Sequence, residues 1–499
     1  MLKKYHYILL LLFFITLFFS ADLQHTLNLK PTGVHQWRQT DCATYALNYY
    51  QNNTPFLKPQ MLNQTGTNGY SASEFPLIYF ITGKLYHVFG FHEWVFRCVN
   101  MLVFFMGVMF LFLIVRKFIG NTIAAMIPVI LAGTSPYYFY YGIHFLPNVP
   151  AISMCLAGWY FFFTYLENKK AKWIYLTAFF FCLAGLLKVS DLLSFFAAGT
   201  CLLYLWISKK QLFTKQQLIH ISISGFGLLL INAAWIKYCI WFNAKNGFDL
   251  SLLGILPIWN LNSNQIADIW SRFYTSWSLH IFSPLVWILL GCFLLLFIFQ
   301  FKQMHKMLRS ITTILFTGSI IYLLLFFDAL YHHDYYMLTP LIAILFLIIT
   351  VTDFLFKKLA THNSTLKAGI SITVLSALIF WCLNYNSKMQ HHRLFAPEYK
   401  NVSDATSELQ PYMRSLGIMR TDKIISVPDR SSNISLYLFN NPGWTEVFTL
   451  QTLSIQDKIN LGAKYLIIGD STYLNTTEYI PYLNKQIGNY KNFLIFDLQ

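Results

Sequence analysis

A cluster of ionisable and aromatic side chains lies early in the chain, between His35 and Asp41 (HQWRQTD). A carboxylate such as Asp41 can accept a proton from a hydroxyl, and the neighbouring Arg38 favours its ionised form. A second acid, Glu74, lies just before Pro76, a residue that favours the start of a helix. The two acids could therefore form an acid–base site. Both also have a structural interpretation: Asp41 could cap a helix that starts there, and Glu74 could stabilise a helix N-terminus.

The rest of the chain is much less polar. Of its 499 residues, 56% are hydrophobic and 11% are charged, and apolar runs of roughly 17–25 residues recur, which suits membrane-spanning helices. The composition predicts a polytopic α-helical membrane protein. The net charge of +15 could indicate nucleic-acid binding, but the basic residues cluster beside apolar runs, as in cytoplasmic loops. We therefore attribute the positive net charge to cytoplasmic loops between membrane spans and expect no nucleic-acid partner.

Eleven apolar segments define the predicted topology. Lys3 and Lys4 keep the start of the first segment inside, and we favour a retained span over a cleaved signal peptide. The loop 22–97 then lies outside the cytoplasm. Within it, a helix that begins near Asp41 and an amphipathic helix at 76–88 are expected to lie on the membrane surface. The predicted spans are about 7–21, 98–115, 120–134, 150–166, 173–187, 192–207, 218–241, 284–301, 311–328, 337–356 and 368–385.

The last quarter of the chain has the composition of a soluble domain. From about residue 386, short apolar runs alternate with polar turns. The runs at 423–427, 464–469 and 492–496 predict buried strands, and 402–416 predicts a helix. The expected organisation is a transmembrane domain, 1–385, followed by a small extracytoplasmic α/β domain, 386–499.

Several further polar residues lie near predicted outer ends of spans. Lys188 could bind a lipid-borne phosphate there, or it could simply extend its ammonium group toward water. Arg38, Arg97 and Arg272 follow the same reasoning. The segment 332–336 (HHDYY) could donate hydrogen bonds to phosphate or sugar hydroxyls, or belong to an aromatic belt.

These polar residues do not predict a metal site. Adjacent residues of a helix do not face each other, so the two histidines and the aspartate of 332–336 are poorly spaced to hold a metal together. The eight cysteines lie mostly in apolar runs and show no metal-binding spacing. They predict neither a disulfide framework nor a zinc site.

Several short segments occur in a defined order along the chain. They are WRQTD at 37–41, EFPL at 74–77, LYHVFG at 85–90 followed by Arg97, SP at 135–136, PNVP at 147–150, GLLK at 185–188 and HDYY at 333–336. This ordered set, which covers about residues 1–350, resembles the GT-C glycosyltransferases. It is most similar to the bacterial members grouped with protein O-mannosyltransferases and the aminoarabinose transferase of lipid A.

The resemblance implies a GT-C fold and a sugar donor carried on polyprenyl phosphate. The acceptor would be a hydroxyl of a lipid, glycan or protein at the outer face of the bacterial inner membrane, with membrane lipids around the protein. Asp41 would be the base that deprotonates this hydroxyl, Glu74 would be a second acid, and the anomeric carbon would be inverted. The expected substrate-binding residues are His35, Arg38, Arg97, Lys188, His332, His333 and Tyr335. Of these, Arg38, Lys188 and His332 or His333 would stabilise the leaving phosphate.

One departure from the family concerns the number of acids. Many relatives carry an acid in the second outer loop, where this chain has Asn148. Because a lipid phosphate is already a good leaving group, the chemistry requires no cofactor, although a divalent metal stays an open alternative. The rival functions are a polymerase or ligase of lipid-linked surface glycans and a transporter or flippase of lipid-linked sugars. A transporter would place ionisable residues near the bilayer centre, whereas these charges lie at span ends.

Overall fold

The computed structural model describes residues 4–208, 213–248, 254–359, 365–400, 402–447 and 453–499. The chain divides into two compact units. Unit 1 comprises Met1–Leu27, Cys98–Trp235 and Gly254–His392, and unit 2 comprises Asn28–Arg97, Ile236–Leu253 and Arg393–Gln499. Unit 2 therefore combines three separate parts of the sequence. This grouping differs from the predicted domains 1–385 and 386–499, which stay a prediction.

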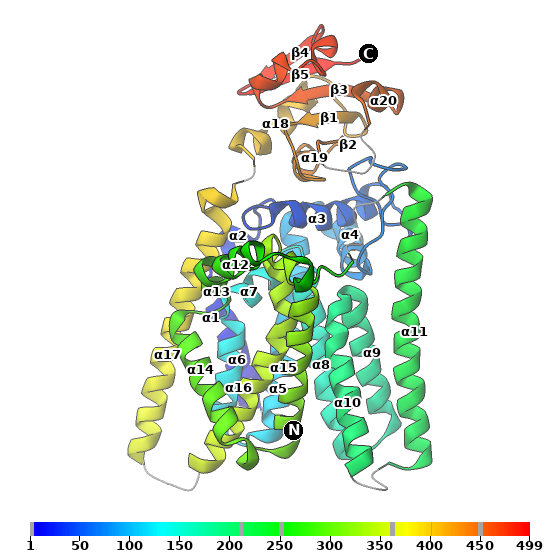
Figure 1. Ribbon diagram of the computed structural model, residues 1–499. Coiled ribbons are helices and arrows are strands. Elements are labelled where there is room, and N and C mark those ends of the chain that lie inside the picture. The colour runs from blue at the N-terminus through cyan, green and yellow to red at the C-terminus, as the bar shows by residue number, and fades with distance from the viewer. Residues whose placement is uncertain (1–3, 209–212, 249–253, 360–364, 401, 448–452) are drawn as a thin grey trace. The chain divides into compact units, whose positions relative to one another are not determined.

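Unit 1 is built of apolar helices. Helices suit such sequences because they satisfy the backbone hydrogen bonds internally where water is absent. Helix α5 begins in unit 2, and α11 and α17 end there. The helices are α1 (Lys4–Ser20), α2 (Leu23–Thr26), α5 (Glu93–Phe118), α6 (Thr122–Gly133), α7 (Pro136–Gly142), α8 (Asn148–Asn168), α9 (Ala171–Leu187), α10 (Leu192–Ser208), α11 (Lys215–Asn246), α12 (Ser263–Arg272), α13 (Ser278–Ile281), α14 (Pro284–Phe299), α15 (Lys306–Leu325), α16 (Leu338–Leu359) and α17 (Thr365–Phe395) (Figure 1).

Six helices in the described part of the chain are long and apolar enough to cross a membrane, or up to eight if each of two bent pairs is one span. One pair, α6 and α7, is bent by 71°. At this bend Ser135 caps α7 and Pro136 lies in its first turn, which favours a new helix start. The predicted class of polytopic helical membrane protein is confirmed. Each of the eleven predicted spans coincides with a helix, but eleven crossings stay a prediction.

Unit 2 combines helices of the first loop with a small C-terminal α/β fold. The loop contains α3 (Gln36–Gln51) and α4 (Leu77–Phe89), and α4 coincides with the second amphipathic helix predicted there. The C-terminal elements are α18 (Asp404–Ser415), β1 (Lys423–Val427), α19 (Ile434–Phe439), β2 (Gly443–Trp444), α20 (Ile455–Asn460), β3 (Ala463–Ile468), β4 (Gln486–Tyr490) and β5 (Phe493–Asp497).

The sheet has the order β2-β1-β3-β5-β4. Strand β1 is parallel to β2 and β3, whereas β5 is antiparallel to β3 and β4. Ile425, Leu466 and Phe496, one from each central strand, are buried in a shared core with Trp444. The three predicted strands and the predicted helix at 402–416 are confirmed. The sequence reasoning missed β2, which is only two residues long, and β4, whose sequence QIGNY is mostly polar.

The first loop is hydrogen-bonded to the edge of this sheet. The Gly443 N–H donates to the Leu62 carbonyl at 3.1 Å, and the Gln64 N–H donates to the Gly443 carbonyl at 2.7 Å. Asn63 thereby forms an isolated parallel bridge with Gly443. On its other side, Gly443 lies against Ile424 of β1. A Cβ atom at position 443 would collide with the carbonyl oxygen of Ile424, so the close approach of β2 to β1 requires glycine.

Helix α3 begins earlier than the sequence predicted. It starts at Gln36, after His35 in the left-handed conformation with φ of 55°. The Gln39 side chain donates to the carbonyls of Thr32 and Val34, at 2.8 and 2.9 Å, and ties the first turn to the preceding segment. Asp41 therefore lies inside the helix and not at its N-terminus. The interpretation of Asp41 as a helix cap is wrong, because the first turn is made by residues 36–39.

Candidate active site

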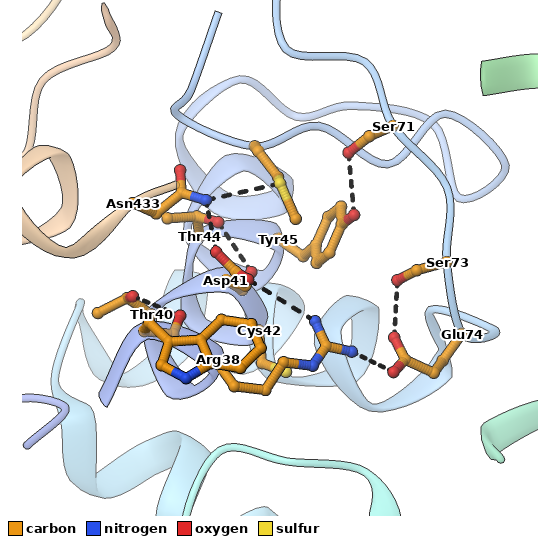
Figure 2. Close-up of polar contacts among 12 residues, drawn as sticks. Arg38, Thr40, Asp41, Cys42, Thr44, Tyr45, Ser71, Ser73, Glu74 and Asn433 are labelled. Carbon is orange, nitrogen blue, oxygen red and sulfur yellow. Dashed lines mark hydrogen bonds and ion pairs between the residues drawn. The ribbon is translucent and has the colours of Figure 1, made fainter. Parts of the chain in front are cut away.

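Asp41 and Arg38 share one face of α3. They are three residues apart, a spacing that places side chains next to each other on a helix. Arg38 Nη1 lies 3.9 Å from Asp41 Oδ2, and the two side chains are only 14% and 7% exposed. The carboxylate and the guanidinium are thus largely shielded from water (Figure 2). Burial makes their mutual electrostatic interaction stronger than it would be on an open surface.

Glu74 approaches Arg38 from the segment that precedes α4. Arg38 Nη2 donates to Glu74 Oε1 in a short ion pair, and the Ser73 hydroxyl donates to Glu74 Oε2 at 2.6 Å. Figure 2 shows the guanidinium between the two carboxylates. Helix α4 begins after Pro76, as predicted, and Glu74 lies outside it. The two predicted acids are therefore brought together, and both interact with one arginine.

A third residue of this site was missed by the sequence reasoning. Asn433 Nδ2 donates to Asp41 Oδ1 at 2.8 Å, across a separation of 392 residues (Figure 2). Asn433 lies directly before α19, and its side chain is fully buried. No pattern in the sequence signals this contact, because a single asparagine before a helix is usually read as a cap.

The surroundings of Asp41 raise its pKa from 3.8 to about 6. Burial is the largest cause, because it disfavours the charged form. The nearby Arg38 and the hydrogen bond from Asn433 oppose this effect, whereas the negative charges of Glu74 and Asp429 add to it. At neutral pH the carboxylate is therefore mostly ionised, yet more basic than an ordinary aspartate. This combination suits a group that accepts a proton near neutral pH.

Two other predicted binding residues of unit 2 have different environments. His35 precedes α3, and its ring packs edge-on against Trp37 with 6.3 Å between ring centroids. Arg97 is fully buried and donates to the Leu29 carbonyl at 3.0 Å. This placement favours a structural role for Arg97 at the start of the loop. The binding roles of both residues stay predictions.

The remaining predicted site residues belong to unit 1. Lys188 follows α9, and its ammonium nitrogen lies 5.8 Å and 4.7 Å from the ring centroids of Tyr335 and Tyr336. The His333 ring stacks on both tyrosine rings, at 5.4 and 5.9 Å, whereas His332 is exposed. Aromatic faces attract an ammonium group, and the positive charge of Lys188 is the feature of this cluster that an anionic group would pair with. The structure thus groups Lys188, Tyr335 and His333 in unit 1, and Arg38, Asp41 and Glu74 in unit 2.

The segment that carries these tyrosines is held from within unit 1. Asp334 is buried, and the Tyr141 hydroxyl donates to its carboxylate in a short hydrogen bond. The Tyr137 hydroxyl donates to the Asp334 backbone carbonyl. The aromatic helix α7 therefore fixes the backbone beside Tyr335. Arg272 donates to the Tyr331 carbonyl at 2.7 Å and binds the same segment from α12.

Among the described residues, no group of three or more His, Cys, Asp or Glu side chains is placed to hold a metal ion. The eight cysteines are free thiols. Asn148, where an acid occurs in many relatives, is the first residue of α8 and is buried.

Comparisons with known proteins agree with this architecture. Residues 73–236 match the family described as dolichyl-phosphate-mannose-protein mannosyltransferase. This match includes Glu74 and Lys188 but begins after Asp41. A search of curated proteins gave no match.

Several solved structures share the fold. ArnT from Cupriavidus metallidurans bound to undecaprenyl phosphate aligns at 11% identity with a TM-score of 0.60, over 99% of this chain and 98% of that one. The oligosaccharyltransferase AglB from Archaeoglobus fulgidus aligns at 11% identity with a TM-score of 0.54, over 96% and 70%. The arabinofuranosyltransferase AftD from Mycobacteria aligns at 10% identity with a TM-score of 0.58, over 100% and 40%. The chain therefore has the fold of the GT-C membrane glycosyltransferases, as the resemblance implied.

Proposed function

We propose that this protein is a glycosyltransferase that moves a sugar from a polyprenyl-phosphate donor to an acceptor hydroxyl, with Asp41 as the base. The observation that carries the proposal is the environment of Asp41: a buried carboxylate beside Arg38, with a pKa of about 6. The shared fold supports the class of reaction, since ArnT was solved with undecaprenyl phosphate. The donor lipid for this chain is inferred from that likeness.

The reaction forms one bond and breaks one bond at the anomeric carbon. As the acceptor oxygen attacks, its proton passes to Asp41, and the bond between the anomeric carbon and the phosphate oxygen breaks. The electron pair leaves with the polyprenyl phosphate, and the configuration is inverted because attack and departure occur on opposite faces. Arg38 carries positive charge beside the base, and it already balances Glu74. We therefore assign Glu74 to holding Arg38 in place, and not to a second proton transfer.

On the basis of the family resemblance, we assign the binding of the lipid phosphate to Lys188. Its ammonium group lies over the Tyr336 ring, just beyond the end of α9. A positive charge of this kind stabilises the phosphate as it gains charge during bond cleavage. His333 and Tyr335 line the same region of unit 1, and we propose that they bind the donor as well.

The test is sugar transfer by purified protein from polyprenyl-phosphate sugars to candidate lipid, glycan and protein acceptors. Asp41→Asn should reduce transfer by at least about a hundredfold, the usual contribution of a positioned base. The matched control is Asp404→Asn, which removes an exposed acid of unit 2 that pairs with Lys400 at the surface. Undiminished transfer by the Asp41 variant would show that Asp41 is not the base. Movement of the lipid-linked sugar across a bilayer without a new glycosidic bond would indicate a flippase.

We also propose that the reaction takes place outside the cytoplasm of a bacterial cell, in the inner membrane. The support is the distribution of lysines and arginines, which cluster between the predicted spans on one side. A C-terminal alkaline phosphatase fusion should be active and a C-terminal green fluorescent protein fusion dark. The reverse pattern would place the C-terminal α/β fold in the cytoplasm.

A further inference from the structure

The amide of Asn433 has only one orientation compatible with its neighbours. Its Oδ1 lies 3.0 Å from the backbone N–H of Asn63, which can only donate. Its Nδ2 lies 2.8 Å from Asp41 Oδ1, which can only accept when ionised. Nδ2 also approaches the Met61 sulfur at 3.5 Å, a weak acceptor. The three neighbours agree, so the amide nitrogen must face the carboxylate.

The turn that carries Asn433 is itself held by hydrogen bonds from the C-terminal α/β fold and from the first loop. The Asp429 carboxylate accepts hydrogen bonds from the backbone and hydroxyl groups of Ser431 and Ser435, at 2.6–2.8 Å. From the first loop, Asn63 Nδ2 donates to the Ser432 carbonyl at 2.8 Å. The turn is therefore fixed before and after Asn433. Because the amide donor is already fixed by the turn, little further conformational entropy is lost when it binds a carboxylate.

Resting on the proposed function, we propose that Asn433 positions the base: its amide holds Asp41 Oδ1 and leaves Oδ2, the oxygen nearest Arg38, for the acceptor hydroxyl. The C-terminal α/β fold then supplies part of the catalytic centre. Asn433 touches the base and not the substrate, so it is a positioning residue.

This role has a consequence for the pH dependence of transfer. Within unit 2, the charged or titratable groups that act on Asp41 are Arg38, Glu74 and Asp429, with the Cys42 thiol next in sequence. The amide of Asn433 favours the ionised carboxylate. Loss of the amide should therefore make Asp41 harder to ionise and move the acid limb of the activity profile to higher pH. A merely structural role would lower the amount of active protein without moving this limb.

The experiment compares Asn433→Ala and Asn433→Asp by measuring transfer across pH with the purified full chain. Asn433→Asp keeps the shape and the acceptor for the Asn63 N–H but places a second carboxylate against Asp41. Both variants should shift the acid limb upward by about half a pH unit or more, with the larger shift for Asn433→Asp because like charges disfavour ionisation. At the optimum of the unmodified protein, kcat should fall at least about tenfold while KM for the donor changes by less than about twofold.

The matched control is Asn441→Ala, which removes another fully buried asparagine of the same fold. Asn441 donates to the carbonyls of Met419 and Asp422, at 2.9 Å each, and accepts from Arg414. Its loss should lower thermal stability and leave the acid limb unchanged. Because aspartate is the same size as asparagine, Asn433→Asp keeps the test informative if the alanine variant does not fold.

The outcomes separate this inference from the proposed function. If Asp41→Asn abolishes transfer but both Asn433 variants keep the acid limb in place, Asp41 is the base and the positioning role of Asn433 is wrong. If Asp41→Asn retains full transfer, the proposed base itself is wrong. If both proposals are right, adding Asn433→Ala to the Asp41→Asn protein should cause no further loss, since residues that act as a unit are not additive.

Discussion

Replacing Arg38 by methionine removes the guanidinium between Asp41 and Glu74 while it keeps a long side chain. The distance of 3.9 Å between Arg38 Nη1 and Asp41 Oδ2 corresponds to about 4 kcal/mol of Coulomb energy at an effective dielectric constant of about 20. This energy is equivalent to about three powers of ten in the ionisation equilibrium of Asp41. Solvent and structural relaxation will reduce the effect. We therefore expect the acid limb of activity to move to higher pH by at least about one unit.

The assay is sugar transfer measured over the pH range in which Asp41 ionises. With the pKa of Asp41 at about 6, the unmodified protein should be half-maximally active near that pH. A shift of at least about one unit means that Arg38→Met should lose about half or more of its transfer at pH 7 and regain it in alkali. Arg420→Met is the control, because Arg420 in the same unit donates to Gln51 instead. An acid limb that stays in place in Arg38→Met would show that Arg38 does not govern the ionisation of Asp41. That result would refute the electrostatic argument.

Three further predictions concern unit 2. Asp41→Asn should raise the free energy of unfolding at neutral pH by up to about 3 kcal/mol, because the carboxyl is harder to ionise in the folded state. Since its pKa is 3.8 when unfolded and about 6 when folded, the gain should be absent below the lower value and complete above the higher one, as thermal unfolding against pH would show. Glu74→Gln should move the acid limb to lower pH, because one negative charge near Asp41 is lost; an upward shift in the activity profile would contradict this. Gly443→Ala should destabilise unit 2 by about 1–3 kcal/mol through overpacking against Ile424, and an unchanged thermal unfolding temperature would contradict the close approach described above.

The sequence was sufficient for features that depend on local pattern. The apolar runs predicted helices at all eleven positions, and β1, β3 and β5 were predicted because buried strands consist of short runs of Ile, Leu and Phe. The proximity of Arg38 to Asp41 was expected from their closeness in the sequence, but the helix face that they share was not, because the predicted helix began only near Asp41. The start of α3 was misplaced because the first turn is fixed by Gln39 and its bonds to Thr32 and Val34.

Features that depend on contacts between distant segments were not predictable in this way. The ion pair between Glu74 and Arg38 requires the segment before α4 to fold back onto α3. The bridge between Asn63 and Gly443 is formed by backbone groups. Every residue type carries these groups, so the sequence does not indicate the bridge. Asn433 reaches Asp41 across 392 residues. One sequence contains no signal that pairs two polar residues so far apart.

The bridge between the first loop and the sheet edge also has a consequence for biosynthesis. Asn63 is synthesised 370 residues before Asn433 and 380 residues before Gly443. At about 5–20 residues per second, the nascent first loop waits roughly 20–80 seconds for its partners. During this interval Asp41 lacks its hydrogen bond from the Asn433 amide, so a site that depends on Asn433, as proposed above, cannot form until that residue has been synthesised and folded. A chain truncated before Asn433 would therefore lack this hydrogen bond to Asp41.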